Sequence, residues 1–344
     1  MRILNWKAEV EVILTEKRAI LYNDAEGRER MKRVVSISLG SSKRDKRVQA
    51  NFFGTDFEIE RIGTDGDMKK YRQMVADLDG KVDAFGVGGC DIYLYAGERR
   101  YIFREPLSLM VGAKATPFVD GSGLKHTLER ETVGYLQDSG TIDFSTKRVL
   151  LVSAVDRFGM AEALATRARS IVFGDMLFGL GLPFPMRSWA QAQRLARLLL
   201  PVVVRLPFQW FYPTGEKQEH NTPKFTPYFQ EADIVAGDFL LIRRFMPEDM
   251  RGKVILTNTT TDADVAELKR RGVAQLITTT PVFEGRSFGT NVMEAVLVTL
   301  LGKPPEQITP ADYLNKLKEL GWTPQIQELN PAPAPQAAAS AAPA

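Results

Sequence analysis

The stretch KRVLLVSAVDRFGMAEALATRARSIVFGD, residues 147–175, decides the fold class of this chain. Its first part, KRVLLVSAV, is a continuous apolar run of the kind that forms a strand buried in a parallel sheet. After a turn, the helical pattern GMAEALATRARS begins at Gly159, and SIVFGD at 170–175 has the composition of a second strand. A strand, a helix and a second strand in this order make a βαβ unit. We therefore expect an α/β protein with a parallel sheet.

Strand-like and helix-like segments continue on both sides of this unit. The upstream strand-like segments are KRVVSISLG, FEIERIG (57–63) and VDAFGVGG (82–89), followed by a hairpin in IYLYAGERRYIF (92–103). The downstream strand-like segments are ADIVAGD, KVILTN and QLITTT. Helices are expected after the turn GTDG, in DADVAELKRRG, in TNVMEAVLVTLLG and in ITPADYLNKLKELGW. This alternation extends the α/β prediction to most of the chain.

The predicted organisation has two domains and three peripheral parts. Residues 31–140 are expected to form an N-terminal α/β substrate domain. Residues 141–303 are expected to form a Rossmann-like, doubly wound parallel-sheet domain that binds a dinucleotide. Residues 304–330 hold a C-terminal helix. Residues 1–30 are expected to be an accessory segment with a hairpin, and 331–344, which are Pro/Ala-rich, a disordered tail.

Composition excludes several classes of protein. The 45 Lys+Arg and 42 Asp+Glu residues leave a net charge of +3, too small to predict nucleic-acid binding. Cys90 is the single cysteine, which excludes a disulfide scaffold, and with only His126 and His220 no metal is expected. The most apolar region, 195–211, contains Arg and Pro, so no membrane span is expected. We expect a cytoplasmic protein, and leave open whether it forms a homo-oligomer.

The turn after the strand at 147–155 is the candidate cofactor site. Of the glycines in the pattern G-x-G-x-x-G, only Gly159 is present; Ser153 is small enough for the first position, and Arg157 offers a phosphate contact. Asp175 ends the second strand, where an acid accepts hydrogen bonds from ribose hydroxyls. We expect NAD as cofactor, with NADP as the alternative. An ordinary βαβ unit without a dinucleotide accounts for this turn equally well.

Polar residues follow several of the predicted strands. Asn258 and Thr259 come after one strand and Thr280 after the next. Because open parallel sheets bind ligands beyond the carboxyl ends of their strands, these residues are expected to contact the cofactor. The alternative is that they cap helices. The loop EGRSFGTN (284–291) has the same two interpretations, a ligand loop or capping by Thr290 or Asn291.

The second half of the chain resembles a known family in its order of elements. The run from KRVLLVSAV through ADIVAGD to VILTNTTTDADVAELKRRGVAQLITTTPVFEGRSFGTNVMEAVLVTLLG is similar to the nucleotide half of shikimate/quinate dehydrogenases. The segments MKRVVSISLGSSKRD, RIGTDGDMKK and GKVDAFGVGG resemble a bacterial group labelled quinate 5-dehydrogenase. The resemblance covers most of residues 31–303. It implies NAD(P)-dependent oxidation of a hydroxyl on a cyclic hydroxy acid such as quinate or shikimate.

The loop FVDGSGLKH, at the expected junction of the two domains, holds the candidate catalytic residues. Lys125 is a candidate general acid/base if burial lowers its pKa, with Asp120 orienting it. The pKa of His126 needs a smaller shift for the same role, and Lys114 is a further candidate for the general acid/base. The shikimate dehydrogenase segments that carry the family's Lys–Asp pair are missing at the matching places. The alternative is that Lys125 and His126 are solvated residues at the start of a helix.

Polar or reactive side chains also follow two strands of the N-terminal half. Ser41, Ser42, Lys43 and Arg44 follow the first strand, where they are suited to hold a carboxylate or phosphate, although a solvated basic loop is the simpler interpretation. Cys90 is expected to be a small buried residue because it has no identifiable base partner. The function predicted is a dehydrogenase acting on a small anionic substrate. The alternatives are a nucleotide- or metabolite-binding module without turnover, and a reductase for another carbonyl compound.

Overall fold

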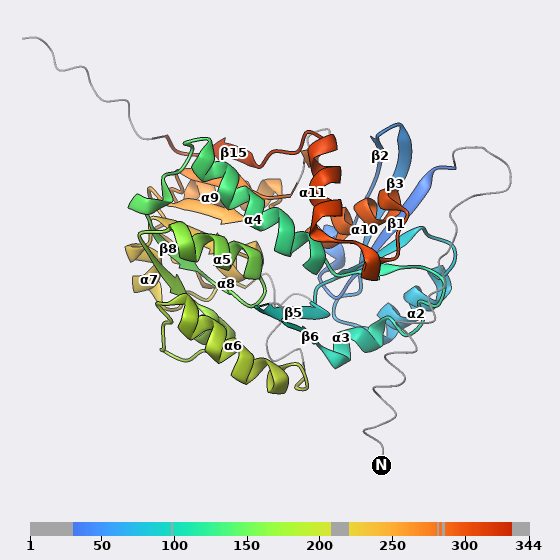
Figure 1. Ribbon diagram of the computed structural model, residues 1–344, viewed down its shortest axis with the longest axis horizontal. Coiled ribbons are helices and arrows are strands. Elements are labelled where there is room, and N and C mark those ends of the chain that lie inside the picture. The colour runs from blue at the N-terminus through green and yellow to red at the C-terminus, as the bar shows by residue number, and fades with distance from the viewer. Residues whose placement is uncertain (1–29, 98, 208–219, 281, 284–285, 332–344) are drawn as a thin grey trace, which may run out of the picture.

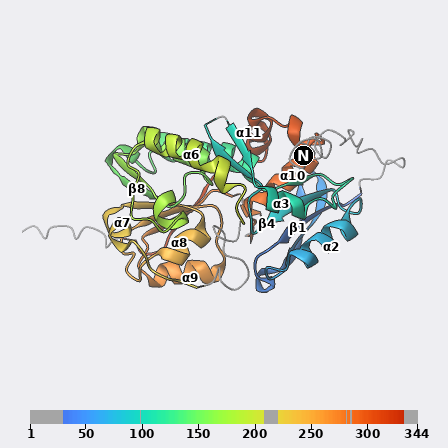
Figure 2. The same ribbon diagram turned by 90° about the horizontal axis from the view of Figure 1, so that it is seen from below.

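The α/β class with parallel sheets is confirmed. The computed structural model describes residues 30–97, 99–207, 220–280, 282–283 and 286–331. Within these ranges the chain forms one five-stranded and one six-stranded sheet, each mostly parallel and each associated with helices. Figures 1 and 2 show the two sheets side by side, in two units. The predicted accessory segment and Pro/Ala tail lie outside the described residues, apart from residues 30 and 331.

The first sheet has the order β2-β3-β1-β4-β7. Its strands are β1 (Lys32–Ser38), β2 (Lys46–Phe52), β3 (Thr55–Gly63), β4 (Ala84–Gly88) and β7 (Phe118–Val119). β1 pairs in parallel with β3 and with β4, and β2 turns back antiparallel on β3. β2 was not expected from the sequence. It is an edge strand whose residues are mostly exposed, so only Val48 and Phe52 are buried.

Both faces of the first sheet are covered, so the last five residues of β1, 34–38, are all buried. Val35 and Ile37 share a core with Tyr71 and Val75 of α2 (Met68–Leu78). On the other face, Val34 belongs to a core formed with α10 (Thr290–Leu301). The same unit carries α3 (Arg104–Leu109) and the hairpin of β5 (Tyr93–Ala96) and β6 (Arg99–Ile102), which lies where the sequence predicts it.

The second sheet has the order β15-β12-β11-β10-β8-β9. Its strands are β8 (Arg148–Leu151), β9 (Ser170–Phe173), β10 (Ile234–Gly237), β11 (Val254–Thr257), β12 (Gln275–Thr278) and β15 (Gln325–Glu328). The first five are parallel, and β15 is antiparallel to β12. Numbered along the chain, the parallel strands run 2-1-3-4-5, as in flavodoxin-like sheets, instead of the dinucleotide-binding order 3-2-1-4-5-6. In the part of the chain that the structure describes, no strand of this sheet lies beyond β9.

Three of the helical segments associated with the second sheet, at 175–179, 226–231 and 239–245, were not expected from the sequence. The helices of this sheet are α5 (Phe158–Arg167), α6 (Trp189–Val203), α7 (Thr226–Glu231), α8 (Phe239–Phe245) and α9 (Asp262–Arg270), together with a π-helical turn at Asp175–Gly179. The short helix α8 was not expected from the sequence; it begins at the cap Asp238, whose side chain accepts from the amides of Leu240 and Leu241.

The chain crosses between the two units three times. After β7 of the first sheet, α4 (Ser122–Asp138) packs against α5 of the second unit. After β12 and the small hairpin β13 (Val282–Phe283) and β14 (Arg286–Ser287), α10 returns to pack on β1 and β4. α11 (Pro310–Glu319) lies on α4 and α10, and β15 then closes the edge of the second sheet. The last strand of the second sheet therefore comes, in sequence, after a segment that packs on the first sheet.

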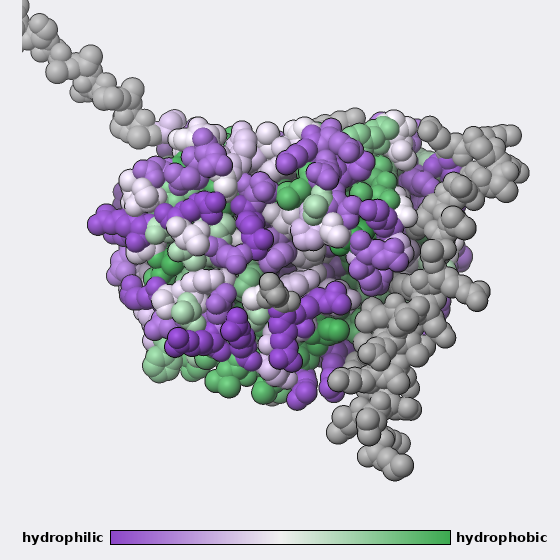
Figure 3. Space-filling view, viewed as in Figure 1, coloured by the Kyte–Doolittle hydropathy of each residue, from purple (hydrophilic) through white to green (hydrophobic). Residues whose placement is uncertain are grey.

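Helix α6 has two apolar faces. One face, with Ala192 and Leu200, is buried, whereas Leu198 and Val202 are 71% and 57% exposed. In Figure 3 apolar residues gather along the lower edge, over α6. The apolar region 195–211, part of which lies in α6, was expected not to span a membrane. Among the residues that the structure describes, none of the helices is both long and apolar enough to do so.

Gly159 allows α5 to approach α4 closely. A Cβ at this position would lie 2.2 Å from the carbonyl oxygen of His126, which belongs to the backbone of α4. Gly134 in the middle of α4 is the opposite case, since a Cβ there meets no atom within 4 Å.

We predict that Gly159→Ala lowers the free energy of unfolding by about 1–3 kcal/mol, because the added methyl group pushes two helices apart. Gly134→Ala is the matched control and should raise it by about 0.4–1 kcal/mol, since alanine loses less backbone entropy in a helix. Urea unfolding of both variants measures the difference. Equal stability of the two variants would contradict this role of Gly159.

Candidate functional site

A cleft of about 1150 Å³ lies between the two units. Each sheet has one topological switch point, where successive strands begin to be added on the opposite side. It lies between β1 and β4 in the first sheet and between β8 and β10 in the second. Ligands of open α/β sheets bind outside the carboxyl ends of the strands at such a point. Here the loops that follow all four strands line the same cleft. Their lining residues include Ser41, Cys90, Asp91, Asp156 and Asp238.

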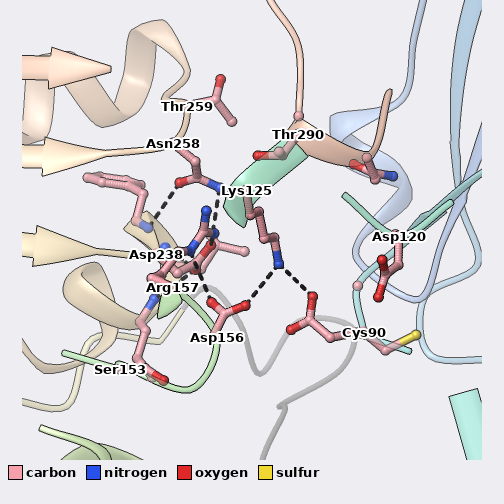
Figure 4. Close-up of a pocket in the computed structure, with 18 of the residues that line it drawn as sticks. Cys90, Asp120, Lys125, Ser153, Asp156, Arg157, Asp238, Asn258, Thr259 and Thr290 are labelled. Carbon is pink, nitrogen blue, oxygen red and sulfur yellow. Dashed lines mark hydrogen bonds and ion pairs between the residues drawn. The ribbon is translucent and has the colours of Figure 1, made fainter. Parts of the chain in front are cut away.

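Lys125 of α4 lies at the centre of this cleft. Its Nζ donates to Asp91 Oδ1 at 2.6 Å and to Asp156 Oδ1 at 2.8 Å (Figure 4). Asp91 follows β4 of the first sheet and Asp156 follows β8 of the second, so one ammonium group joins the two units. Burial disfavours its charge, but Asp156 and Asp91 outweigh this and raise the pKa of Lys125. The lysine therefore stays protonated near neutral pH.

The buried ion network continues from Asp156 to Arg157. The Arg157 side chain is 2% exposed and is paired with Asp156, with Glu129 of α4 and, at 2.8 Å, with Asp238 at the start of α8. Asn258, beyond β11, donates to Asp238 Oδ2 at 3.2 Å. The guanidinium is fully engaged by acids of the protein itself. It is therefore not available for the phosphate contact expected from the sequence.

Asp175 occupies the turn that was expected to hold a pyrophosphate. Its Oδ1 accepts from the backbone amides of Ala154 at 2.9 Å and Val155 at 3.0 Å, and from the hydroxyl of Ser153 at 3.3 Å. A dinucleotide site needs these amides for its phosphates. The acid therefore points into the turn instead of toward a ribose, and its carboxylate takes the place of the anion.

Asp120 has a structural role in the loop before α4. Its carboxylate accepts from the amides of Ile92 and Tyr93, at 2.7 and 2.8 Å, and from that of Ser122. Asp120 also acts on Glu294 of α10: burial first, and then the charge of Asp120, raise the pKa of Glu294 to about 8. The hydroxyl of Tyr313 in α11 donates to Glu294 at 2.8 Å. α10 thus carries a buried acid that is protonated at neutral pH.

The structure brings some of the predicted site residues together and leaves others outside the cleft. The cleft is lined by Asp120, Lys125, Ser153, Arg157, Asp175, Asn258 and Thr259. His126 does not line the cleft; its ring stacks between Tyr95 and Phe158. Thr280 is fully buried and donates to the carbonyl oxygen of Asn258.

Lys114 and Gly159 also lie away from the cleft. Lys114 is exposed beyond α3, where its amide donates to Asp79. Gly159 lies between α4 and α5, so its role is helix packing instead of cofactor binding.

The sequence interpretation missed the acidic members of the network. Asp91 comes two residues after the run GVGG, which was interpreted only as the end of a strand. Asp156, in the turn after the strand at 147–155, was not among the predicted site residues, although an acid after a buried strand is itself a signal for a polar site. Within the described ranges, no group of three or more His, Cys, Asp or Glu side chains has the arrangement of a metal site.

Two family models match the chain. One, described as "Domain of unknown function (DUF8754)", matches residues 123–329, and one described as "Domain of unknown function (DUF8753)" matches residues 33–120. A search of curated proteins finds no match.

Solved structures similar to the chain include a substrate-binding protein of a sugar ABC transport system from Bordetella parapertussis 12822 (10% identity, 81% of this chain and 82% of that chain, TM-score 0.33). Others are a galactofuranose-binding protein (11%, 85% and 100%, 0.34) and a glutamate dehydrogenase (10%, 92% and 83%, 0.39). At these identities and TM-scores, the likeness identifies no ligand or activity.

The expected membership in the quinate/shikimate dehydrogenase family is wrong. The family models that match residues 123–329 and 33–120 are domains of unknown function, and neither is a dehydrogenase family. The predicted dehydrogenase activity and NAD(P) cofactor are wrong as well. Asp175 fills the phosphate turn, Arg157 is held by acids, and Lys125 is fixed as an ammonium group.

We predict that Lys125→Met lowers the free energy of unfolding by about 3–5 kcal/mol, because it leaves the buried Asp91 without its cation and Asp156 with Arg157 alone. Adding Asp91→Asn should recover part of this loss. Lys303→Met is the control: Lys303 is 47% exposed and pairs only at the surface with Asp312, so the loss should stay within about 1 kcal/mol. Chemical unfolding measures all three. A Lys125→Met protein as stable as the control would refute the proposed role of the network.

We predict that Glu294 makes stability fall as pH rises. Its pKa is about 8 in the folded protein against 4.5 as the ordinary value, so between these pH values the folded state holds a proton that the unfolded state releases. Stability from this group is complete below pH 4.5 and is lost as pH rises through about 8. Glu294→Gln should flatten the pH dependence of urea unfolding, and the exposed control Glu319→Gln should not. Parallel curves for wild type and Glu294→Gln would count against the buried acid.

Proposed function

The chain belongs to the family described as "Domain of unknown function (DUF8754)", and we propose that it binds a small polar molecule in the cleft between its two units without chemical turnover. The observation that supports this most is that the switch points of both sheets meet in one cleft. Each sheet alone offers one wall of a binding site. Together they can enclose a ligand, as expected for sites between domains.

The cleft walls differ in character and suit a ligand with several polar groups. The wall of the second unit presents Asp238, Asn258 and the run Thr259–Thr261 after successive strands. Side chains of α6, among them Trp189, Leu199 and Val203, add an apolar surface. Short hydroxyl, amide and carboxylate groups beside an apolar surface are the usual means of orienting a small polar molecule. Sugars and other polyhydroxylated metabolites have this chemistry.

The state of the central lysine favours binding over catalysis. A general acid/base must exchange a proton near the operating pH. Lys125 is held by two carboxylates that raise its pKa, and Asp156 is held as a carboxylate because, against its burial, Lys125 and Arg157 lower its pKa. Burial, and then the charge of Asp156, raise the pKa of Asp91 to about 7, but neither Lys125 nor Asp156 is suited to proton transfer at neutral pH. Their role in this proposal is to set the relative position of the two walls.

We predict that a member of a panel of sugars, sugar acids and sugar phosphates raises the melting temperature by binding the folded state. Val155→Trp, which fills the cleft from the β8 loop, should abolish the effect. Val202→Trp on the exposed side of α6 is the matched control and should retain it. Undiminished ligand binding by Val155→Trp, or the absence of a stabilising ligand in the panel, would overturn the proposal.

A further inference from the structure

The N-terminus of α10 opens into the cleft without a side-chain cap. The N-cap residue is Gly289, in an extended conformation, and the next residues, Thr290 and Asn291, line the cleft. The first N–H groups of a helix have no acceptor within the helix, and its dipole makes this end positive. Capping by Thr290 or Asn291, one interpretation of the sequence, is not what the structure shows, because α10 has no side-chain cap bond.

Thr290 supplies a second, independent indication of a ligand. The residue is 4% exposed, lines the cleft, and among the described residues its Oγ1 has no hydrogen-bond partner. Figure 4 shows the side chain pointing toward the space beside Asn258 and Thr259. Buried hydroxyl groups are normally satisfied, so one left open toward a cavity indicates a missing partner. Asn291 is fixed differently, since its Nδ2 donates to Ser36 of β1 at 2.7 Å.

Basic side chains of the first unit lie at the same end of the cleft. Lys46 at the start of β2 has its Nζ 5.9 Å from the ring centroid of Phe288, the residue before the cap of α10. Arg61 of β3 donates to Ser38 at 3.2 Å, and Lys43 and Arg44 also line the cleft. This end is therefore basic, whereas the walls around Asp91, Asp156 and Asp238 are acidic.

We propose that the N-terminus of α10, with the hydroxyl of Thr290 and the ammonium group of Lys46, binds an oxyanion group of the ligand. This inference rests on the proposed function and narrows it. The ligand is then a small polyhydroxylated molecule that carries one phosphate or carboxylate. Its anion lies at the α10 end, and its hydroxyl groups face the acids and amides of the second unit. A helix N-terminus with a hydroxyl and a nearby cation is suited to such a group.

The test uses inorganic phosphate and acetate as probes, titrated into the full chain by calorimetry at constant ionic strength. We expect one of the two to bind with a single site, and Thr290→Val, which keeps the shape of the side chain, to weaken it about tenfold. Lys46→Gln should weaken it as well and reduce its dependence on salt. Thr299→Val is the matched control on the same helix, since its hydroxyl donates to Ala295 at the other end, and should leave affinity unchanged.

Equal affinities of wild type and Thr290→Val, or the absence of binding of both anions to wild type, would overturn the oxyanion site. Glucose and glucose 6-phosphate then separate this inference from the proposed function. If both bind equally in wild type and Thr290→Val while Val155→Trp blocks both, the cleft binds ligands and the oxyanion site is refuted. If phosphate binds equally to wild type and to Val155→Trp, the oxyanion site is retained and the proposed binding of ligands inside the cleft is refuted. Far-UV circular dichroism confirms that each variant is folded.

Discussion

The arrangement of the two units depends on one buried ammonium group. Lys125 comes from the helix that connects the sheets, and its partners Asp91 and Asp156 come from one sheet each. Removing a charge from water costs several kcal/mol unless an opposite charge compensates for it. Lys125 is the cation that compensates Asp91, and it shares the compensation of Asp156 with Arg157. The loops after β4 and β8 are therefore held at a fixed separation, and that separation sets the width of the cleft at its centre.

The same network explains why the βαβ turn after β8 does not offer a dinucleotide the groups that it would bind. A βαβ turn offers free amides and an adjacent cation, and in this chain both are already paired. Asp175 accepts from the amides, and Arg157 is shared by Glu129, Asp156 and Asp238. The amides and the cation of this turn are therefore hydrogen-bonded or ion-paired within the protein. What remains open to a ligand lies farther along the strand ends and at α10, the helix that returns to the first sheet.

The sequence predicts local structure well where burial is regular, and predicts side-chain partners poorly. The strands β8 and β9 follow from apolar runs and the helix between them from its helical pattern, and α11 follows from its start signals Thr309 and Pro310. β2 escapes prediction because an exposed edge strand carries little periodicity. Lys125, predicted as a catalytic residue at the domain junction, lines the cleft, but its partners lie 34 and 31 residues away, and only the tertiary fold brings them within reach. Asp175 shows the limit most clearly, since an acid at a strand end can point to a ligand or back into its own turn.

The return of the chain to the second sheet through β15 has a consequence for folding. β15, the partner of β12, comes after α10 and α11 in the chain, and these two helices pack on the first unit and on α4. During synthesis, β12 emerges as an edge strand with unpaired backbone groups, and it stays so until the last described segment arrives. Such edges pair readily with other chains. The order of assembly also depends on contacts that are distant in sequence, which slows folding. The two units therefore mature together, and the period before β15 closes the sheet is when a nascent chain is most exposed to aggregation.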